Sequence, residues 1–375
     1  MDEAQHRARV VIMGSYAPSL LSFRGRLIEE MVCRGHHVFA LAPGIDQATA
    51  EALRRIGAEP IVVAFQRTSL DPFNALKGAR ELRLLFAQLR PDVVIAYTIK
   101  PVVLAGPAAR AVGARFIPMI TGLGFAFLHG AGVKQFVAKI AASALYRRAF
   151  KYAAVVLFQN ADDEEEFRRR RILPRRIASG LVNGSGVDLT EYEQQPVPSA
   201  PVFLMIARFL RAKGVREYAG AAIGLKTQFP AARFCLAGWI DESPDAISPA
   251  ELDQMVRGGV EHLGHLSDVR PALAQCSVYV LPSYREGTPR SVLEAMAVGR
   301  AILTTDAPGC RETVVEGENG LLVPVGDQAA LERAMRSFLD DHHLASRMGA
   351  ASRRLAERKY EVGSVNKAIL GYAHL

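Results

Sequence analysis

The sequence predicts an α/β protein made of two Rossmann-like domains, each a parallel sheet covered by helices. Its 375 residues exceed the usual size of one domain. Short apolar runs alternate with amphipathic stretches along the whole chain, which is the pattern of βαβ units. A proline-rich stretch at residues 194–201 divides these runs into two sets, and we interpret it as a linker.

The apolar runs predict strands in both halves of the chain. Those of the first half span residues 10–13, 37–41, 60–64, 92–96, 115–120, 154–158 and 177–182. Those of the second half span residues 202–206, 233–237, 261–263, 278–281, 301–304 and 321–323. Ligands of such sheets bind outside the carboxyl ends of the strands, so we expect the site in a cleft between two facing halves.

Composition indicates a soluble globular protein of a reducing compartment, which favours the cytoplasm. Half of the residues are hydrophobic and 22% are charged. No apolar run reaches the roughly 20 residues that a membrane-spanning helix needs, and the polar start lacks the order of a secretory signal. The scattered cysteines form no Cys-x-x-Cys pair, so we expect thiols rather than disulfides or a zinc site; they are Cys33, Cys235, Cys276 and Cys310.

Positive charge is concentrated in the first half. Residues 1–195 hold 26 Lys and Arg against 18 Asp and Glu, whereas residues 196–375 hold 20 of each kind. Such asymmetry indicates an anionic partner for the first half. The basic residues are not interleaved with aromatic ones and no nucleic-acid-binding motif occurs, so an anionic membrane surface or a phosphorylated acceptor is favoured over nucleic acid.

Two glutamates surround a turn that opens a helix in the second half. Glu286 stands in the loop after the predicted strand 278–281, and Glu294 lies one turn into a helix predicted over residues 291–298. A helix start offers free N–H groups to an anion such as a diphosphate, and carboxylates accept hydrogen bonds from hydroxyls. A nucleotide sugar combines both groups. Spacing alone does not distinguish a ligand-binding role of these glutamates from a purely structural one, because the helix dipole also favours a glutamate in the first turn of a helix.

The residues around this pair resemble a known signature. Glu-Gly-x-Pro-x-Ser-x-Leu-Glu-Ala, from Glu286 onward, is similar to the Glu-x7-Glu motif of retaining glycosyltransferases of family 4. Arg208 and Lys213-Gly214 resemble that family's Arg-x4-Lys-Gly pattern, although basic residues at a strand end are often only solvated. The resemblance implies the GT-B architecture, with Arg208 and Lys213 on the donor diphosphate, Glu286 orienting the sugar as a catalytic residue, and Glu294 holding the ribose.

Further segments extend the donor site that the resemblance implies. Gly238 ends a predicted strand where the nucleotide would lie, and the segment 263–268 resembles the base-contacting loop. Gly14 and Ser15 end the first strand where family members carry a glycine-rich loop, of which this chain keeps one glycine. The remaining implied donor residues are Gly264, His265, Leu266, Gly287, Thr288, Pro289, Arg290, Ser291 and Val292.

The first half resembles a bacterial subgroup of family 4 that extends glycans on undecaprenyl diphosphate. The similar segments are 69–76, 97–101 and 120–124. This implies an acceptor-side domain over residues 1–195, a nucleotide-sugar-binding domain over 196–356, and a C-terminal helix over 357–375 that returns to the first domain or simply caps the second. The implied acceptor residues are Arg24, Thr98, Lys100, Thr121 and Gly122, with Lys100 also placed in the catalytic set. A lysine at a strand end is often only solvated, and a threonine before glycine often only serves a turn. For Lys100 and Thr121, acceptor contact and such an ordinary structural role therefore both remain open.

Together these features predict transfer of a hexose or N-acetylhexosamine from a UDP-sugar to a polyprenyl-diphosphate-linked glycan, with retention and without cofactor. No Asp-x-Asp motif occurs, and His129, His262 and His265 lack metal-ligand spacing, so we expect no metal. Arg208, Lys213 and the N–H groups of a helix start would then stabilise the leaving group, which itself takes the acceptor proton. The alternatives are a UDP-sugar epimerase or hydrolase, and a catalytically silent nucleotide-sugar-binding protein.

A helix predicted within residues 133–151 suits the inner face of the plasma membrane as a peripheral contact. Its apolar members are Phe136, Ile140, Leu145 and Phe150, and its basic members are Lys134, Lys139, Arg147, Arg148 and Lys151. This composition favours an anionic leaflet. A helix that faces the core with a solvated basic rim is the alternative.

Overall fold

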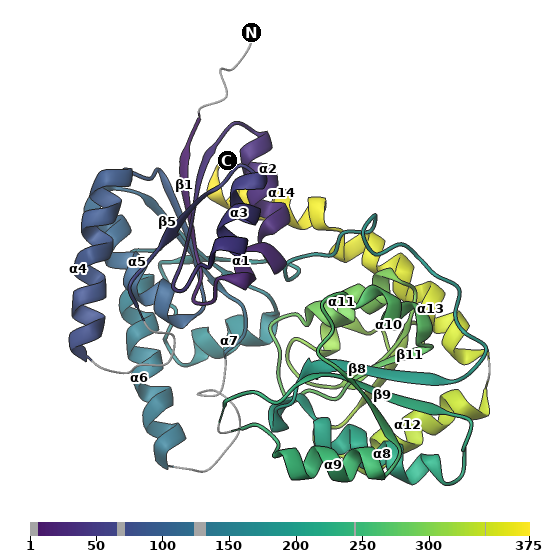
Figure 1. Cartoon of the computed structure of the whole chain (residues 1–375). Helices are drawn as coiled ribbons and strands as arrows, with labels where there is room; N and C mark the ends of the chain where they lie inside the picture. The colour runs from purple at the N-terminus through teal and green to yellow at the C-terminus, as the bar shows by residue number, and fades with distance from the viewer. Residues whose placement is uncertain (1–6, 66–71, 124–132, 244, 342) are drawn as a thin grey trace. The chain divides into compact units, whose positions relative to one another are not determined.

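The computed structural model describes residues 7–65, 72–123, 133–243, 245–341 and 343–375. The chain forms two compact units (Figure 1): unit 1 comprises Met1–Ser185 with Val365–Leu375, and unit 2 comprises Gly186–Ser364. Each contains one parallel sheet, so the expectation of two Rossmann-like parallel-sheet domains is confirmed. The units divide between Ser185 and Gly186, whereas the sequence interpretation placed the boundary after residue 195.

Unit 1 holds a seven-stranded sheet in the order β3-β2-β1-β4-β5-β6-β7. β1 lies between β2 and β4, with Val10 opposite both Val38 and Val93. The strands are β1 Arg9–Met13, β2 His37–Ala42, β3 Glu59–Val62, β4 Val93–Tyr97, β5 Arg115–Ile120, β6 Val155–Phe158 and β7 Ala178–Leu181.

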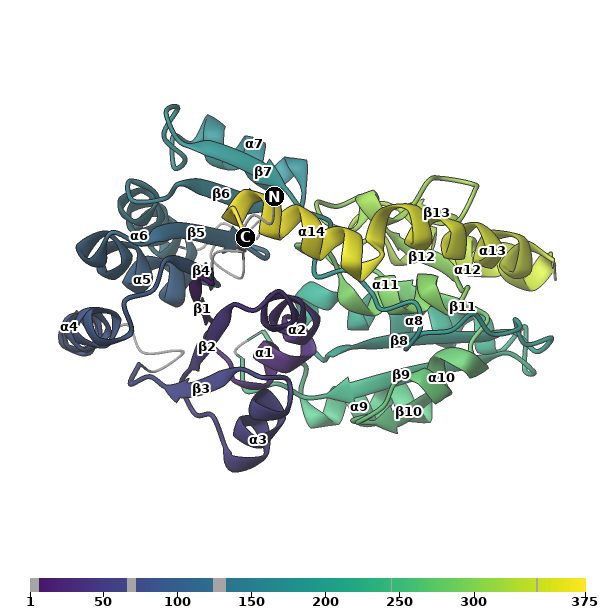
Figure 2. The same cartoon turned by 90° about the horizontal axis from the view of Figure 1, so that it is seen from above.

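Helices cover both faces of this sheet (Figure 2). They are α1 Pro18–Ser22, α2 Gly25–Cys33, α3 Gln47–Arg55, α4 Pro72–Leu89, α5 Ile99–Val112, α6 Val133–Phe150, α7 Ala161–Arg169 and α14 Val362–Ala373. Alternate strand residues face opposite sides, so Val11 packs in a core with Phe86 of α4, and Ile12 packs in a second core with Ile28 of α2 and Ile369 of α14. The strands therefore read as continuous apolar runs, as parallel sheets buried on both faces do.

Unit 2 holds a six-stranded sheet in the order β10-β9-β8-β11-β12-β13. Its strands are β8 Val202–Arg208, β9 Arg233–Trp239, β10 Val260–Gly264, β11 Val278–Leu281, β12 Ala301–Thr305 and β13 Gly320–Val323. Its helices are α8 Val215–Lys226, α9 Pro249–Arg257, α10 Arg270–Gln275, α11 Arg290–Ala297, α12 Gln328–Asp340 and α13 Leu344–Leu355. The stacked rings of Phe203 and Phe234, 5.3 Å apart, lie in its core.

The end of the chain is not the single helix predicted from residue 357. α13 passes into a π-helical turn over Ala356–Tyr360, and α14 begins only at Val362. Val187 causes the break: its N–H donates to the Tyr360 carbonyl (2.8 Å) and its carbonyl accepts from the Val362 N–H (3.1 Å). A strand-like bridge at Glu361 thus replaces one helical turn.

Candidate active site

Two loops of unit 2 bring the residues of both sequence motifs together. β8 and β11 are neighbours in the sheet, so the loops that follow them meet at its carboxyl edge. The Lys213 ammonium donates to Oε1 of Glu286, and the Ser283 hydroxyl donates to the same oxygen at 2.7 Å. Two residues 73 positions apart are therefore in direct contact, and they belong to the two motifs assigned to the donor site.

Glycines allow these loops to approach each other. Gly214 has a φ of +75°, and a Cβ there would lie 2.1 Å from the Pro282 carbonyl oxygen. Gly309 has a φ of +81°, and its Cβ would lie 2.3 Å from the Glu286 carbonyl oxygen. Only glycine fits both the conformation and the space, so the backbone beneath the Lys213–Glu286 pair is closely defined.

Arg208 is held by a carboxylate that sequence reasoning missed. Its Nη1 donates to Oδ2 of Asp241 at 2.9 Å, and Oδ1 of Asp241 accepts the Ser243 N–H at 2.8 Å. The Arg208 side chain is 38% exposed, and Nη1 is its one engaged nitrogen among the described residues. Asp241 thus fixes one edge of the guanidinium and leaves Nε and Nη2 for a ligand.

The loop that carries Lys213 is braced by Asp245. The Asp245 carbonyl accepts the Arg211 N–H (2.8 Å), and its Oδ2 accepts the Ala212 N–H (3.0 Å). The N–H of Lys213 donates to the Leu210 carbonyl at 3.0 Å. These backbone groups hold the loop rather than face a ligand, so the charge that this loop offers comes from its side chains.

Glu294 lies in α11 at the centre of a buried cluster. Its Oε1 accepts hydrogen bonds from the Tyr192 hydroxyl (2.9 Å) and from Nε of Arg290 (2.7 Å). Burial raises the pKa of Glu294, while Arg290 and Tyr192 act in the opposite direction. Arg290 was predicted as a donor contact and forms an i,i+4 pair with Glu294. Tyr192 carried no sequence signal.

The other predicted residues of this helix start have divided roles. Pro289 is the N-cap residue of α11, preceded by Gly287 and Thr288. Val292 is fully buried in the core. The Ser291 hydroxyl forms a hydrogen bond with Tyr279. The side chain of Val292 therefore packs in the core, and that of the half-buried Ser291 contacts Tyr279.

Aromatic rings lie at the carboxyl edge of β9 and β10. Trp239, the one tryptophan of the chain, is 44% exposed and meets the His265 ring edge to face at 4.8 Å between centroids. Gly238 precedes it, where a Cβ would lie 1.8 Å from the Ala207 carbonyl oxygen. The structure thus brings Gly238 together with His265, which follows Gly264 and precedes Leu266.

In unit 1, the predicted residues Ser15 and Thr98 meet at the carboxyl edge of the sheet, where they follow the neighbouring strands β1 and β4. The Thr98 hydroxyl donates to that of Ser15 at 2.9 Å. Thr98 has φ +66° and ψ 156°, a backbone region that is almost restricted to glycine and costs about 1–3 kcal/mol. Lys100 lies in the first turn of α5, where burial lowers its pKa.

Tyr97 supports this corner; it stands in the segment 97–101 that resembles the family, but sequence reasoning assigned it no role. Its hydroxyl lies 2.9 Å from Oγ of Ser19, and the guanidinium carbon of Arg24 lies 5.2 Å from its ring centroid. A Cβ on Gly14 would lie 2.3 Å from the Tyr97 hydroxyl oxygen. Tyr97 therefore requires the one glycine of this loop and places the buried Arg24 beneath it.

Thr121 and Gly122 follow β5, which neighbours β4 at the same edge of the sheet. Gly122 has a φ of +119°. Of the segments that resemble the lipid-acceptor subgroup, residues 69–71 and residue 124 lie outside the described residues.

The proposed membrane helix α6 exposes part of the predicted apolar face, Ile140 and Leu145, but not Phe150. Phe150 is fully buried and packs against Tyr146 and Phe167, so its assignment to the outer face is wrong. Val137, Ile140 and Leu145 are 58%, 55% and 43% exposed. The side chains of Lys134 and Phe136 lie outside the described part. No helix within the described ranges is long and apolar enough to cross a bilayer.

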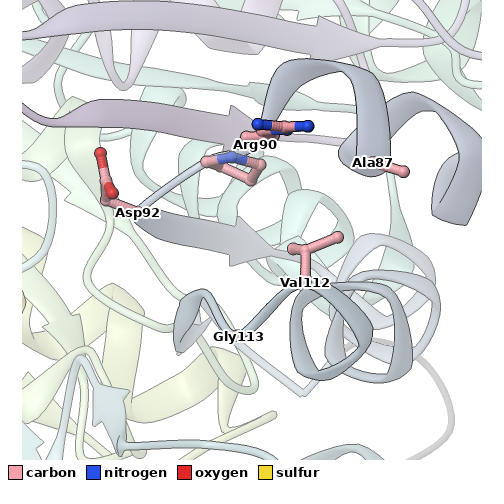
Figure 3. A pocket seen from close by; sticks show the side chains of 6 residues that line it. Ala87, Arg90, Asp92, Val112 and Gly113 are labelled. Carbon is pink, nitrogen blue, oxygen red and sulfur yellow. The ribbon is translucent and has the colours of Figure 1, made fainter.

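A hollow of about 480 Å³ in unit 1 lies away from these residues (Figure 3). Its lining includes Arg90, Asp92 and Gly113, at the amino end of β4. Asp92 accepts the Arg9 N–H at 2.7 Å, a contact between loop and sheet. No predicted site residue lines this hollow. In the described part of the chain, no group of three or more His, Cys, Asp or Glu side chains is arranged to hold a metal ion.

Comparison with known proteins matches both halves of the chain. Residues 23–179 match the glycosyl transferase 4-like domain, and residues 190–355 match glycosyl transferases group 1. A Campylobacter jejuni protein, N,N'-diacetylbacillosaminyl-diphospho-undecaprenol alpha-1,3-N-acetylgalactosaminyltransferase, is 31% identical over 352 residues, covering 90% of each chain. The chain belongs to glycosyltransferase family 4.

Solved structures of low identity share the fold of this glycosyltransferase. Sucrose-phosphate synthase from Thermosynechococcus elongatus superposes with a TM-score of 0.80 at 18% identity, covering 96% of this chain and 97% of the other. HepE from Anabaena, in complex with UDP-glucose, gives 0.76 at 18% identity, covering 97% and 99%. The GT-B fold expected from the sequence is confirmed.

Proposed function

We propose that this glycosyltransferase moves a hexose or N-acetylhexosamine from a UDP-sugar to a glycan on a polyprenyl diphosphate, with retention of configuration. The observation that carries the proposal is the Lys213–Glu286 pair beside Arg208 at one sheet edge. Two cations suit a diphosphate and the carboxylate suits sugar hydroxyls. The C. jejuni relative, named for an undecaprenol-linked substrate, supports the acceptor, and UDP-glucose bound to HepE supports the donor.

The donor site is assigned to residues at the carboxyl edge of unit 2. Arg208, through Nε and Nη2, and Lys213 carry the charge of the departing UDP, and preorganised cations of this kind are worth several kcal/mol where water is excluded. Glu286, oriented by Lys213 and Ser283, binds hydroxyls of the sugar. The carboxylate of Glu294 binds the ribose, and Trp239 with His265 faces the base.

In the reaction, the bond between the anomeric carbon and the UDP oxygen breaks, and an acceptor hydroxyl bonds to that carbon on the same face. The acceptor proton passes to the departing β-phosphate oxygen. Because Arg208 and Lys213 supply positive charge directly, the proposed step needs no metal. The fixed positive charges of Arg208 and Lys213 thus stabilise the negative charge that develops on the departing UDP.

The acceptor and the membrane are assigned to unit 1. Arg24, Thr98, Lys100, Thr121 and Gly122 are the proposed acceptor residues, with Gly14 and Ser15 as further donor contacts. Val137, Ile140 and Leu145 form an exposed apolar stripe on α6, with Arg148 and Lys151 exposed at its end. This arrangement favours peripheral binding to the anionic, cytoplasmic face of the plasma membrane.

A panel of UDP-sugars tests the proposal, with UDP release followed in the presence and absence of a polyprenyl-diphosphate-linked glycan. Acceptor-dependent release of UDP with one sugar is expected, and the product's anomeric configuration should match the donor's. Rapid release without acceptor would favour the hydrolase alternative. Binding without release or sugar conversion would favour a silent nucleotide-sugar-binding protein.

A further inference from the structure

The corner between β4 and α5 combines a strained backbone with a hydroxyl pair. Thr98, the N-cap residue of α5, has φ +66° and makes no capping bond with its side chain. Its hydroxyl instead donates to Ser15 on the loop after β1, 83 positions away. Strain of this kind persists only where surrounding contacts enforce it, and it concentrates at functional sites.

The surroundings of Thr98 explain how the strain is maintained. Tyr97 is 4% exposed, and its hydroxyl bonds to Ser19 at 2.9 Å. Its ring fills the space that a Cβ on Gly14 would need. Because Tyr97 is locked on one side, the next residue must turn sharply to start α5, and this turn aims the Thr98 side chain at Ser15.

Glycine at position 98 would adopt this conformation without strain, but it would carry no hydroxyl. The feature that threonine adds here is its hydrogen bond to Ser15, which accepts it with its own hydroxyl oxygen. With its oxygen engaged as an acceptor, the Ser15 hydroxyl keeps its proton for another acceptor. A phosphate oxygen of the substrate is such an acceptor.

We propose that Thr98 is a positioning residue: its strained backbone aims its hydroxyl at Ser15, and this contact orients the Ser15 hydroxyl as a donor to a substrate phosphate. The proposal rests on the proposed function, in which Ser15 contacts the donor diphosphate. Thr98 thereby acts on the substrate through Ser15, and its strained backbone serves to hold the Thr98 hydroxyl in place for this contact.

Three substitutions separate the hydroxyl from the strain. Thr98→Val keeps the branched shape and the strain but lacks the hydroxyl, Thr98→Gly removes both, and Thr98→Ser keeps both. We expect kcat/KM for UDP-sugar to fall about tenfold in the Val and Gly variants and to stay within about twofold in the Ser variant, since one good hydrogen bond to a charged group is worth about that factor. The Gly variant should nevertheless melt roughly 2 °C or more above the Val variant, because both lack the hydroxyl and only Val retains the strain.

A double-mutant cycle tests whether Thr98 acts through Ser15. In a Ser15→Ala background, Thr98→Val should cost no further activity, because the hydroxyl that it orients is already gone. Additive losses, or full activity of Thr98→Val, would overturn the positioning role. A Gly variant that melts below the Val variant would overturn the strained corner.

These outcomes are distinct from failure of the proposed function. If the wild-type enzyme releases no UDP from any UDP-sugar, the proposed function fails, whereas the melting comparison still decides whether the corner is strained. If wild type transfers sugar and Thr98→Val does so equally well, the proposed function stands and the role of Thr98 is refuted. UDP binding, followed by Trp239 fluorescence, should weaken in the Val and Gly variants and stay near that of wild type in the Ser variant, because UDP carries the diphosphate that Ser15 is proposed to contact.

Discussion

The Tyr192 hydroxyl lies 2.9 Å from Oε1 of Glu294, although the two residues are 102 positions apart. It approaches the carboxylate from outside α11, while Arg290 approaches along the helix. A buried carboxylate between a phenol and a guanidinium has a defined orientation and a pKa that burial raises. This geometry leads to a pH-dependent prediction.

Binding of a UDP-sugar should weaken as the pH falls through the raised pKa of Glu294, because the ribose hydroxyls need an ionised acceptor. Tyr192→Phe removes a hydrogen bond that favours the carboxylate, so the loss should begin at a higher pH in that variant. Trp239 fluorescence titrations from neutral to acid pH measure this, with a UDP-sugar in place of UDP to avoid a terminal phosphate that titrates near pH 6. Glu294→Gln is the control and should bind weakly with no such dependence. Identical profiles of wild type and Tyr192→Phe would refute the coupling.

Lys213→Ala should lower kcat roughly 10²-fold or more, because it removes a cation from the leaving group. Glu286→Ala should lower it comparably through lost orientation of the sugar. Steady-state UDP release measures both effects, and circular dichroism checks that both variants fold. Lys226→Ala, at the far end of α8, is the matched control and should keep wild-type turnover. Near-full turnover of Lys213→Ala would refute the assignment of Lys213 to the donor diphosphate.

Gly309→Ala should reduce both stability and activity. The new Cβ would collide with the Glu286 carbonyl oxygen, and the backbone at this position has a φ of +81°, which strains any residue with a Cβ. We therefore expect the free energy of unfolding to fall by about 2 kcal/mol. Gly317→Ala is the control, because its φ is +77° but nothing lies within 4 Å of the new Cβ. Denaturant unfolding and UDP release compare the two. Equal activity of both variants would show that the close approach does not govern the position of Glu286.

Transfer should be unaffected by chelation, because Arg208 and Lys213 carry the proposed leaving-group charge. Activity after dialysis against EDTA, with and without added Mg²⁺ or Mn²⁺, measures this. Loss in EDTA with recovery on adding either ion would replace the proposed step with a metal-assisted one.

Vesicle flotation tests the α6 stripe. Val137→Ser with Ile140→Ser should weaken binding to both neutral and anionic vesicles, whereas Arg148→Gln with Lys151→Gln should weaken only binding to anionic ones. Each basic residue adds about 1 kcal/mol near such a surface and is screened by salt. Leu84→Ser on α4, where Leu84 is 59% exposed, is the matched control and should bind as wild type. Unchanged flotation of both α6 variants would exclude this helix as the membrane contact.

The fold was predictable because its signal is local. A strand buried on both faces must be apolar throughout, so runs such as 115–120 and 278–281 coincide with β5 and β11. The sequence assigned Lys213 and Glu286 to one donor site by their motifs and by the rule that ligands bind at carboxyl edges of parallel sheets, but it did not predict their direct contact.

The supporting residues could not be predicted, because their roles arise from long-range contacts. Asp241 and Tyr192 lie in unremarkable local sequence, and Tyr97 belongs to a segment that resembles the family but gives it no role. The roles of the three appear only from their positions beside Arg208, Glu294 and Gly14. Phe150 was misplaced for a related reason: α6 is apolar on several faces, so its periodicity does not indicate which face is buried.

The return of the chain to unit 1 has a consequence for its biosynthesis. Val365, Ile369 and Leu370 fill the core beneath α2, yet a ribosome makes them only after the whole of unit 2. At about 5–20 residues per second, one face of the first sheet waits on the order of ten seconds or longer for its last helix. During that interval its apolar surface is open to other nascent chains, so the yield of this enzyme should depend on a chaperone that shields unit 1 until translation ends.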